Sequence, residues 1–227
     1  GLTNEAMFLG LLLTELVTDE HEPKGLLALM LYCEARRPAR RDARGAFVPL
    51  GEQDVRLWDG VFIQAAERAL RAAAAAGRPG RYQTEAAIQS VHCSRTSGQP
   101  TDWASLTVLY DLLTAFAPTV GNLIARAAAY GEAQGPEAGL ALLSAMPEAA
   151  VQAYQPFWAT RAALLRAAGQ SAEADEALAQ FTNRKPCWSD PFSPSGYVIP
   201  LGVLKQAGVR IGEAAFHMAT LVAERFS

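Results

Sequence analysis

Apolar positions along this chain recur mainly at helical spacing, and the alternation typical of strands is nearly absent. Near the N-terminus, Phe8, Leu11, Leu12 and Leu16 follow an i, i+3, i+4, i+8 order behind Thr3, a residue type that often caps helices. This pattern predicts a first helix whose apolar stripe faces the core.

Turn and breaker signals divide the rest of the N-terminal half into helices. Pro23 suits the first turn of a second helix from about Lys24 to Ala35, and Pro38 stops that helix. A polar excursion follows, and the sequence GRPG ends the next helical pattern. Further helices are expected over about residues 53–76 and 82–95, and from about residue 102 onward.

A 34-residue spacing marks the second half. Gly135 and Gly169 lie 34 residues apart, each between two alanine-rich helical patterns, and Pro118 and Pro186 lie twice that distance apart in the same phase. This period, with a small residue in the turn and a proline after the second helix, is the tetratricopeptide pattern. Hairpins of this kind stack because one hairpin alone cannot bury both of its faces.

The expected fold is therefore all-α, a right-handed superhelix of helical hairpins with tetratricopeptide-like repeats and an irregular C-terminal segment. Residues 1–100 form an N-terminal helical subdomain with an arginine-rich connection, residues 101–186 form the repeats, and residues 187–227 form an irregular segment plus a terminal helix. In the repeat phase, equivalent packing positions are occupied by Leu106, Leu140 and Ala174, by Ile124 and Trp158, and by Ala128 and Ala162.

Composition narrows the functional classes. The 227-residue chain is half apolar and carries a net charge of −3, which argues against a globally basic nucleic-acid-binding protein. Its three cysteines, Cys33, Cys93 and Cys187, lack disulfide or metal-ligand spacing and fit buried thiols in a reducing cytosol. The apolar runs are too short to span a bilayer. The chain is expected to be cytoplasmic, and Gly1 at its start suggests an excised piece of a longer protein.

An arginine cluster stands out against this acidic background. Its five members are followed by Glu52, Asp54 and Asp59, so an ion-pair network or a solvated face is the favoured interpretation. A surface for a protein partner comes second. Nucleic acid comes last, because no aromatic residues are interleaved for base stacking. The arginines are Arg36, Arg37, Arg40, Arg41 and Arg44.

The remaining chemistry-bearing residues favour structural roles. Trp58 is expected to be a packing anchor, and Thr101 or Asp102 a helix cap before Trp103. His92 and Cys93 are adjacent in sequence, so their side chains would point to different helix faces and not form a base–nucleophile pair. No motif for catalysis, phosphate binding or metal binding occurs. The sequence therefore predicts neither an enzyme nor a cofactor or metal site.

The concave face of the repeats is a second candidate surface. Its first helices would present mainly alanines together with a few polar side chains, and the face would be small and nearly neutral. It is expected to receive a helix or an apolar segment, and residues 187–227 of the same chain are one candidate occupant. The polar members of this repeat groove are Asn122, Arg126, Glu132 and Arg166.

Several motifs in a fixed order resemble one known family. The stretches GLLALMLYCEARRPARRDARGAFVPLGEQDVRLWD, GRPGRYQTEAAIQSVH, TDWASLTVLYDLL, GPEAGLALL and RAALLRAAGQSAEADEAL look like the C-terminal extension of a subgroup of extracytoplasmic-function (ECF) RNA polymerase sigma factors. The resemblance covers about residues 5–183. Residues 187–227 depart from the usual ending of that extension.

The resemblance implies a regulatory role. Complete members of the family bind core polymerase and promoter DNA through N-terminal domains that this chain does not resemble. The chain would then bind a protein partner: those N-terminal domains, RNA polymerase or a regulator, without direct contact to nucleic acid or membrane. The matched candidate surface comprises Arg36, Arg37, Arg40, Asp42, Gln53, Asp54, Trp58, Asp59, Tyr82, Gln83, Asp102 and Trp103.

Two other functions remain open from the sequence. The chain could be a freestanding tetratricopeptide-like scaffold with no link to polymerase. It could also be a small-ligand sensor, or an enzyme, that uses a pocket around Tyr82, Trp58 and Asp102.

Overall fold

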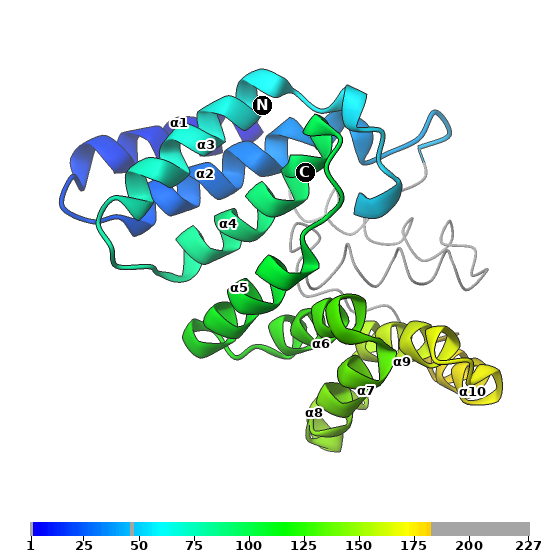
Figure 1. Cartoon of the computed structure of the whole chain (residues 1–227). Helices are drawn as coiled ribbons and strands as arrows, with labels where there is room; N and C mark the ends of the chain where they lie inside the picture. The colour runs from blue at the N-terminus through cyan, green and yellow to red at the C-terminus, as the bar shows by residue number, and fades with distance from the viewer. Residues whose placement is uncertain (1, 46–47, 183–227) are drawn as a thin grey trace. The chain divides into compact units, whose positions relative to one another are not determined.

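The computed structural model describes residues 2–45 and 48–182, and within these ranges the regular structure is helical (Figure 1). Ten α-helices and four 3₁₀ segments are present there, which confirms the all-α class. The described helices contain no segment that is both long and apolar enough to cross a membrane. The predictions for residues 187–227 lie outside the described residues.

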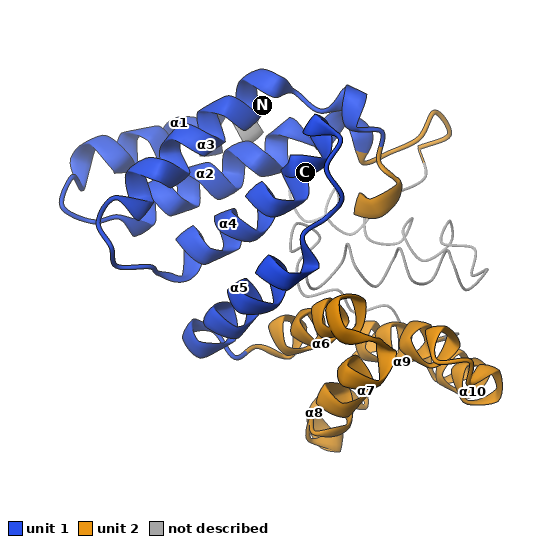
Figure 2. Ribbon diagram, viewed as in Figure 1, with its two compact units in different colours: residues 1–39, 54–118 blue, residues 40–53, 119–227 orange. Residues whose placement is uncertain are grey.

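The chain divides into two compact units (Figure 2). Unit 1 comprises residues 1–39 and 54–118, and unit 2 comprises residues 40–53 and 119–227. The helix that begins near residue 102 thus groups with the N-terminal helices, although the sequence assigned it to the repeat segment. The superhelical arrangement of repeats stays a prediction.

Unit 1 is organised around α2, which packs against α1, α3 and α4, while α5 packs against α4 (Figure 1). At Gly25 of α2, an added Cβ would lie 2.6 Å from the backbone nitrogen of Gln83, so the two helices approach too closely there for a larger residue. The helices are α1 (Leu2–Leu16), α2 (Glu22–Ala35), α3 (Gly60–Ala74), α4 (Arg81–Cys93) and α5 (Trp103–Phe116).

Four 3₁₀ segments join or extend these helices. They are η1 (Arg37–Ala39), η2 (Leu50–Glu52), η3 (Val55–Leu57) and η4 (Ser94–Ser97). The helix predicted from residue 53 in fact starts at Gly60. Two aspartates before it cap separate helical segments. Asp54 caps η3 by accepting the N–H of Arg56, and Asp59 caps α3 by accepting the N–H groups of Val61 and Phe62.

The predicted core-facing stripe of the first helix is wrong. Phe8 is 64% exposed and Leu16 is 73% exposed, and Leu11 and Leu12 also lie at the surface. The helix packs through Gly10, whose backbone lies beside Leu27 and Met30 of α2. Because α1 is apolar on nearly every side, its spacing could not indicate which face is buried. Thr3 is not the cap either, since α1 begins at Leu2.

Unit 2 contains two helix pairs, α6 with α7 and α9 with α10, and both helices of the first pair also contact α9. Gly135 and Gly169 adopt positive φ angles of 104° and 77° at the turns within these pairs, as their spacing predicted. Pro147 caps a separate one-turn helix. The helices are α6 (Val120–Gln134), α7 (Pro136–Ser144), α8 (Glu148–Val151), α9 (Gln155–Ala167) and α10 (Ser171–Thr182).

Small side chains allow the unit 2 helices to approach one another. An added Cβ at Gly139 of α7 would lie 2.6 Å from the carbonyl oxygen of Ala127 in α6. Ala128 and Ala162, predicted to share a packing position, are both buried. One apolar cluster in this unit comprises Ile124, Ala127, Leu143, Val151, Phe157 and Leu164.

Candidate functional site

The predicted partner surface is divided between the two units. Arg36, Arg37 and nearly all the other predicted residues belong to unit 1, whereas Arg40, Asp42 and Gln53 belong to unit 2. In unit 2, Gln53 is buried and its amide donates to the carbonyl oxygen of Val48 over 3.1 Å, and Asp42 accepts the N–H of Arg44 over 2.8 Å.

Arg36 lies at the centre of a buried polar cluster in unit 1. The residue is the C-cap of α2 and is only 3% exposed. Its guanidinium donates hydrogen bonds to Gln89 Oε1 and to the carbonyl oxygen of Tyr32, the latter over 3.4 Å. Among the described residues no carboxylate is paired with Arg36, so the neighbouring amide, carbonyl and ring dipoles stabilise the buried cation.

Trp58 contacts two guanidinium groups. The Arg36 guanidinium carbon lies 6.0 Å from the centre of the indole ring, and that of Arg95 lies 5.6 Å from it, both within the range of cation–π attraction. Trp58 itself is buried, which confirms its predicted role as a packing anchor. These contacts join three segments of unit 1: the end of α2 (Arg36), the residues just before α3 (Trp58) and the 3₁₀ segment η4 after α4 (Arg95).

Six buried polar atoms of unit 1 lack a hydrogen-bond partner among the described residues. Four of them belong to residues that interact with Arg36, and these atoms are Trp58 Nε1, Gln89 Nε2, His92 Nε2 and the Tyr110 hydroxyl. Buried polar groups are nearly always paired with protein, water or a ligand, because an unpaired group loses the hydration it had in water. We define these four residues together with Arg36 as the polar cluster. Its hydrogen-bonding capacity exceeds what its own side chains satisfy.

The electrostatics of the polar cluster keep His92 uncharged. Burial, followed by the positive charges of Arg36 and Arg95, lowers the pKa of His92 to about 3. The ring meets Trp103 edge-on, with centroids 6.0 Å apart. Burial raises the pKa of the adjacent Cys93 thiol to about 11, so at neutral pH this thiol is not a thiolate nucleophile.

Glu67 is a polar neighbour that the sequence reasoning missed. Its carboxylate accepts hydrogen bonds from the Tyr32 hydroxyl and, at 2.6 Å, from Ser90 Oγ. Burial and this carboxylate raise the pKa of Tyr32. The sequence did hold a sign that Glu67 faces the interior. It lies four residues after Ile63 and three before Leu70, so all three share the apolar side of α3.

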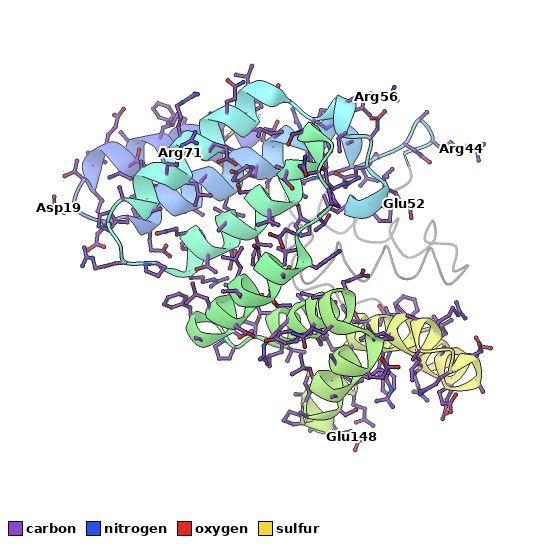
Figure 3. The ribbon with its side chains drawn as sticks, viewed as in Figure 1. Asp19, Arg44, Glu52, Arg56, Arg71 and Glu148 are labelled. Atoms are coloured by element: carbon purple, nitrogen blue, oxygen red, sulfur yellow. The ribbon has the colours of Figure 1, made fainter. Side chains whose placement is uncertain are left out.

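Asp54 and Asp59 do not pair with the five arginines of residues 36–44; an ion-pair network between these arginines and the other acids stays a prediction. Asp54 pairs with Arg56 at 2.7 Å, and the bonds from Arg56 lower the pKa of Asp54 to about 2. Asp59 is occupied by the start of α3. Arg37 pairs with Glu34 at 2.8 Å, and Arg41 donates to the carbonyl oxygen of Gly45. Arg44 lies exposed on the connecting loop (Figure 3).

Tyr82 and Trp58, two of the three residues of the predicted pocket, lie near opposite ends of α4 in unit 1. Tyr82 lies in the first turn of α4, where its N–H donates to Glu22 over 2.7 Å; Gln83 N–H donates to the same carboxylate. Trp58 lies with Arg95, beyond the other end of α4. Ten residues separate Tyr82 from His92, about 15 Å along a helix. Asp102 caps α5 by accepting Ser105 N–H, as predicted.

The predicted repeat groove is largely engaged by its own helices. Asn122 is buried, Arg126 lies over the ring of Tyr130, and Arg166 pairs with Asp175 of α10 at 2.9 Å. Glu132 is exposed. The alanines that were expected to line the groove, including Ala125, Ala129 and Ala159, are buried in the packing.

A cleft of about 420 Å³ instead opens among α7, α8, α9 and α10. None of the four predicted groove residues lines it. Its apolar lining is formed by Leu143, Met146, Val151, Phe157, Trp158 and Ala177, and its polar lining by Ser144, Glu148, Arg161, Glu173, Glu176 and Gln180. The Phe157 and Trp158 rings meet edge-on at 5.2 Å.

Comparison with known proteins gives two matches. Residues 1–74 match the model of a family of unknown function (DUF6596). An uncharacterized protein of Rhizobium meliloti (strain 1021), R00370, is 37% identical over 186 residues, which cover 80% of this chain. The chain spans only 44% of that relative's length. No solved structure matches the chain.

Proposed function

We propose that this chain is a regulatory, protein-interaction part of an ECF-type sigma factor, which controls transcription initiation without itself carrying the promoter- and polymerase-binding domains. The observation that carries the interaction role is the unit 2 cleft, a depression among α7, α8, α9 and α10 with an apolar floor. The order of the motifs from GLLALML to SAEADEAL supports the sigma-factor class. The partner would be the sigma-factor N-terminal domains, RNA polymerase or a regulator in the cytoplasm.

The test of this proposal uses the complete natural gene product that contains the chain. Promoter-dependent transcription with purified core polymerase is measured for the complete protein and for a form that lacks residues 1–227. The expected result is a large change in the amount of transcript, with promoter binding by the remaining domains retained. A reading frame without promoter-recognition domains would overturn the sigma-factor assignment and favour a freestanding helical scaffold.

A second candidate function, a small-ligand sensor, is favoured by the polar cluster of unit 1. A buried guanidinium without a paired carboxylate, together with four unpartnered polar atoms, matches the needs of a small anionic ligand with several hydrogen-bonding groups. Thermal denaturation of the chain with a panel of small carboxylates and phosphates tests this idea. Stabilisation by one compound that disappears in Arg36→Met would support a sensor, whereas no stabilisation by any compound in the panel would count against it.

A further inference from the structure

We propose that the unit 2 cleft binds a basic amphipathic segment of a protein partner, with its apolar side chains on the cleft floor and its lysines or arginines against an acidic rim. The inference rests on the proposed protein-interaction role, and it does not depend on the sigma-factor assignment.

The floor of the cleft supplies the apolar half of the binding site. Met146 and Trp158 are partly exposed there and pack over the buried cluster that includes Phe157 and Val151. Aromatic and methionine side chains are enriched at protein interfaces because they offer large apolar area and adaptable packing. An incoming leucine or phenylalanine side chain would remove this surface from water.

The rim of the cleft sets the charge of the occupant. Glu148 of α8 and Glu173 and Glu176 of α10 all line the cleft and are all exposed; Glu148 extends outward from α8 (Figure 3). None of these three carboxylates forms an ion pair with another described residue. Among the described residues that line the cleft, Arg161 is the one basic residue. The rim therefore carries a net negative charge that a cationic segment would complement.

The spacing of the acids fits a helical or turn-forming segment. Glu173 and Glu176 are three residues apart on α10, so their side chains lie on the same face of that helix, about one turn apart. Glu148 approaches from a different helix. Cations that recur every three or four residues on one side of an apolar stripe would reach both sets of carboxylates.

The experiment measures binding of a fluorescently labelled helical peptide, with leucines on one face and lysines on the other, to the full 227-residue chain. Two comparison peptides are used, one with glutamates in place of the lysines and one with serines in place of the leucines. Only the first peptide should bind, and its affinity should fall as salt is raised, because the rim charges are exposed and screened.

Substitutions locate the binding on the chain. The triple variant Glu148→Gln, Glu173→Gln, Glu176→Gln should bind the peptide about tenfold more weakly, since each exposed pair contributes modestly. Met146→Ser should also weaken binding by removing floor area. The matched control, Glu132→Gln with Glu137→Gln, removes exposed charge from the same unit outside the cleft and should leave the affinity unchanged. Circular dichroism confirms that each variant is folded.

Three results would overturn the proposal. They are equal binding of the glutamate peptide, an unchanged affinity in the triple variant, and tighter binding at the cleft by a peptide of residues 203–226. The last result would mean that residues 203–226 of this chain, and not a partner, occupy the cleft. An unchanged amount of transcript when residues 1–227 are removed, together with cleft-dependent peptide binding, would count against the proposed function alone. Unchanged peptide binding in the triple variant would count against the cleft alone.

Discussion

Units 1 and 2 are both helical, but they fill their interiors in different ways. Unit 1 buries Arg36, Gln89 and His92 among its apolar residues, and several of their polar atoms lack partners among the described residues. Around Ile124, unit 2 packs an apolar cluster that includes Leu143 and Phe157, and Gly139 of α7 lies close to the backbone of Ala127 in α6. Unit 2 also buries polar side chains such as Gln155 and Thr160, but among the described residues only unit 1 buries a charged one, Arg36.

Under the proposed functions, this difference would give the two units different roles. A buried polar cluster discriminates sharply between partners, because a wrong group leaves donors and acceptors unpaired. A packed interior with a surface cleft offers a stable platform on which apolar and charged contacts can be made without rearrangement. If the proposed functions hold, the polar cluster of unit 1 would set specificity for a ligand, and the cleft of unit 2 would bind a protein partner.

The largest expected effect breaks the packing of unit 2. Ile124 is fully buried, so Ile124→Ala removes apolar contacts and leaves a cavity. The free energy of unfolding, measured by urea denaturation followed by circular dichroism, should fall by about 3 kcal/mol. Glu132→Ala, exposed on the same helix, is the control and should change it by less than about 0.5 kcal/mol. A loss below about 1 kcal/mol for Ile124→Ala would mean that α6 repacks freely.

The next effect probes the buried cation of unit 1. Arg36→Ala removes the bond to Gln89 and the contact with Trp58, and should lower the free energy of unfolding by about 2 kcal/mol. Arg36→Met keeps much of the bulk without the charge, and should stay within about 1 kcal/mol of the unsubstituted chain. If both variants are equally destabilised, then the guanidinium itself is required for the fold.

A third prediction concerns the free energy of unfolding as a function of pH, measured by urea denaturation, to which His92 of unit 1 should contribute. The pKa of His92 is about 3 in the folded chain and near 6.5 when unfolded, so between these values the unfolded state binds one more proton. Stability should therefore fall as pH drops below about 6.5, with a slope that approaches 1.4 kcal/mol per pH unit. The free energy of unfolding is measured above about pH 5, because most carboxyl groups stay ionised there and contribute little to the slope. His92→Gln should flatten the slope; an equal slope in that variant would assign it to other groups.

The sequence predicted features whose cause is local. Helix caps at Asp102 and turn glycines at Gly135 and Gly169 depend on a few adjacent residues, and each lies where its pattern indicated. Burial of Trp58 followed from its size and apolar body. The all-α class followed from the spacing of apolar residues along most of the chain.

Features that depend on tertiary pairing were not predicted. Glu22 caps α4 from 60 residues away, and Glu67 accepts bonds from Tyr32 and Ser90 of two other helices. No single-chain pattern indicates which acid meets which donor across such separations. The same limit explains the arginine cluster, where nearby acids were expected to pair with Arg36 but an amide and an indole do so instead.

The smallest expected effect concerns the exposed apolar face of α1. Phe8 is 64% exposed, so Phe8→Ser should change the free energy of unfolding by less than about 0.5 kcal/mol while reducing concentration-dependent self-association. Leu27→Ser, at a buried position of α2 that contacts α1, is the contrast and should destabilise the chain by more than about 2 kcal/mol. Denaturation and light scattering measure the two quantities. Equal destabilisation by both substitutions would show that the face around Phe8 is buried within the chain. The hydrophobic core of unit 1 would then include this face of α1 as well as α2.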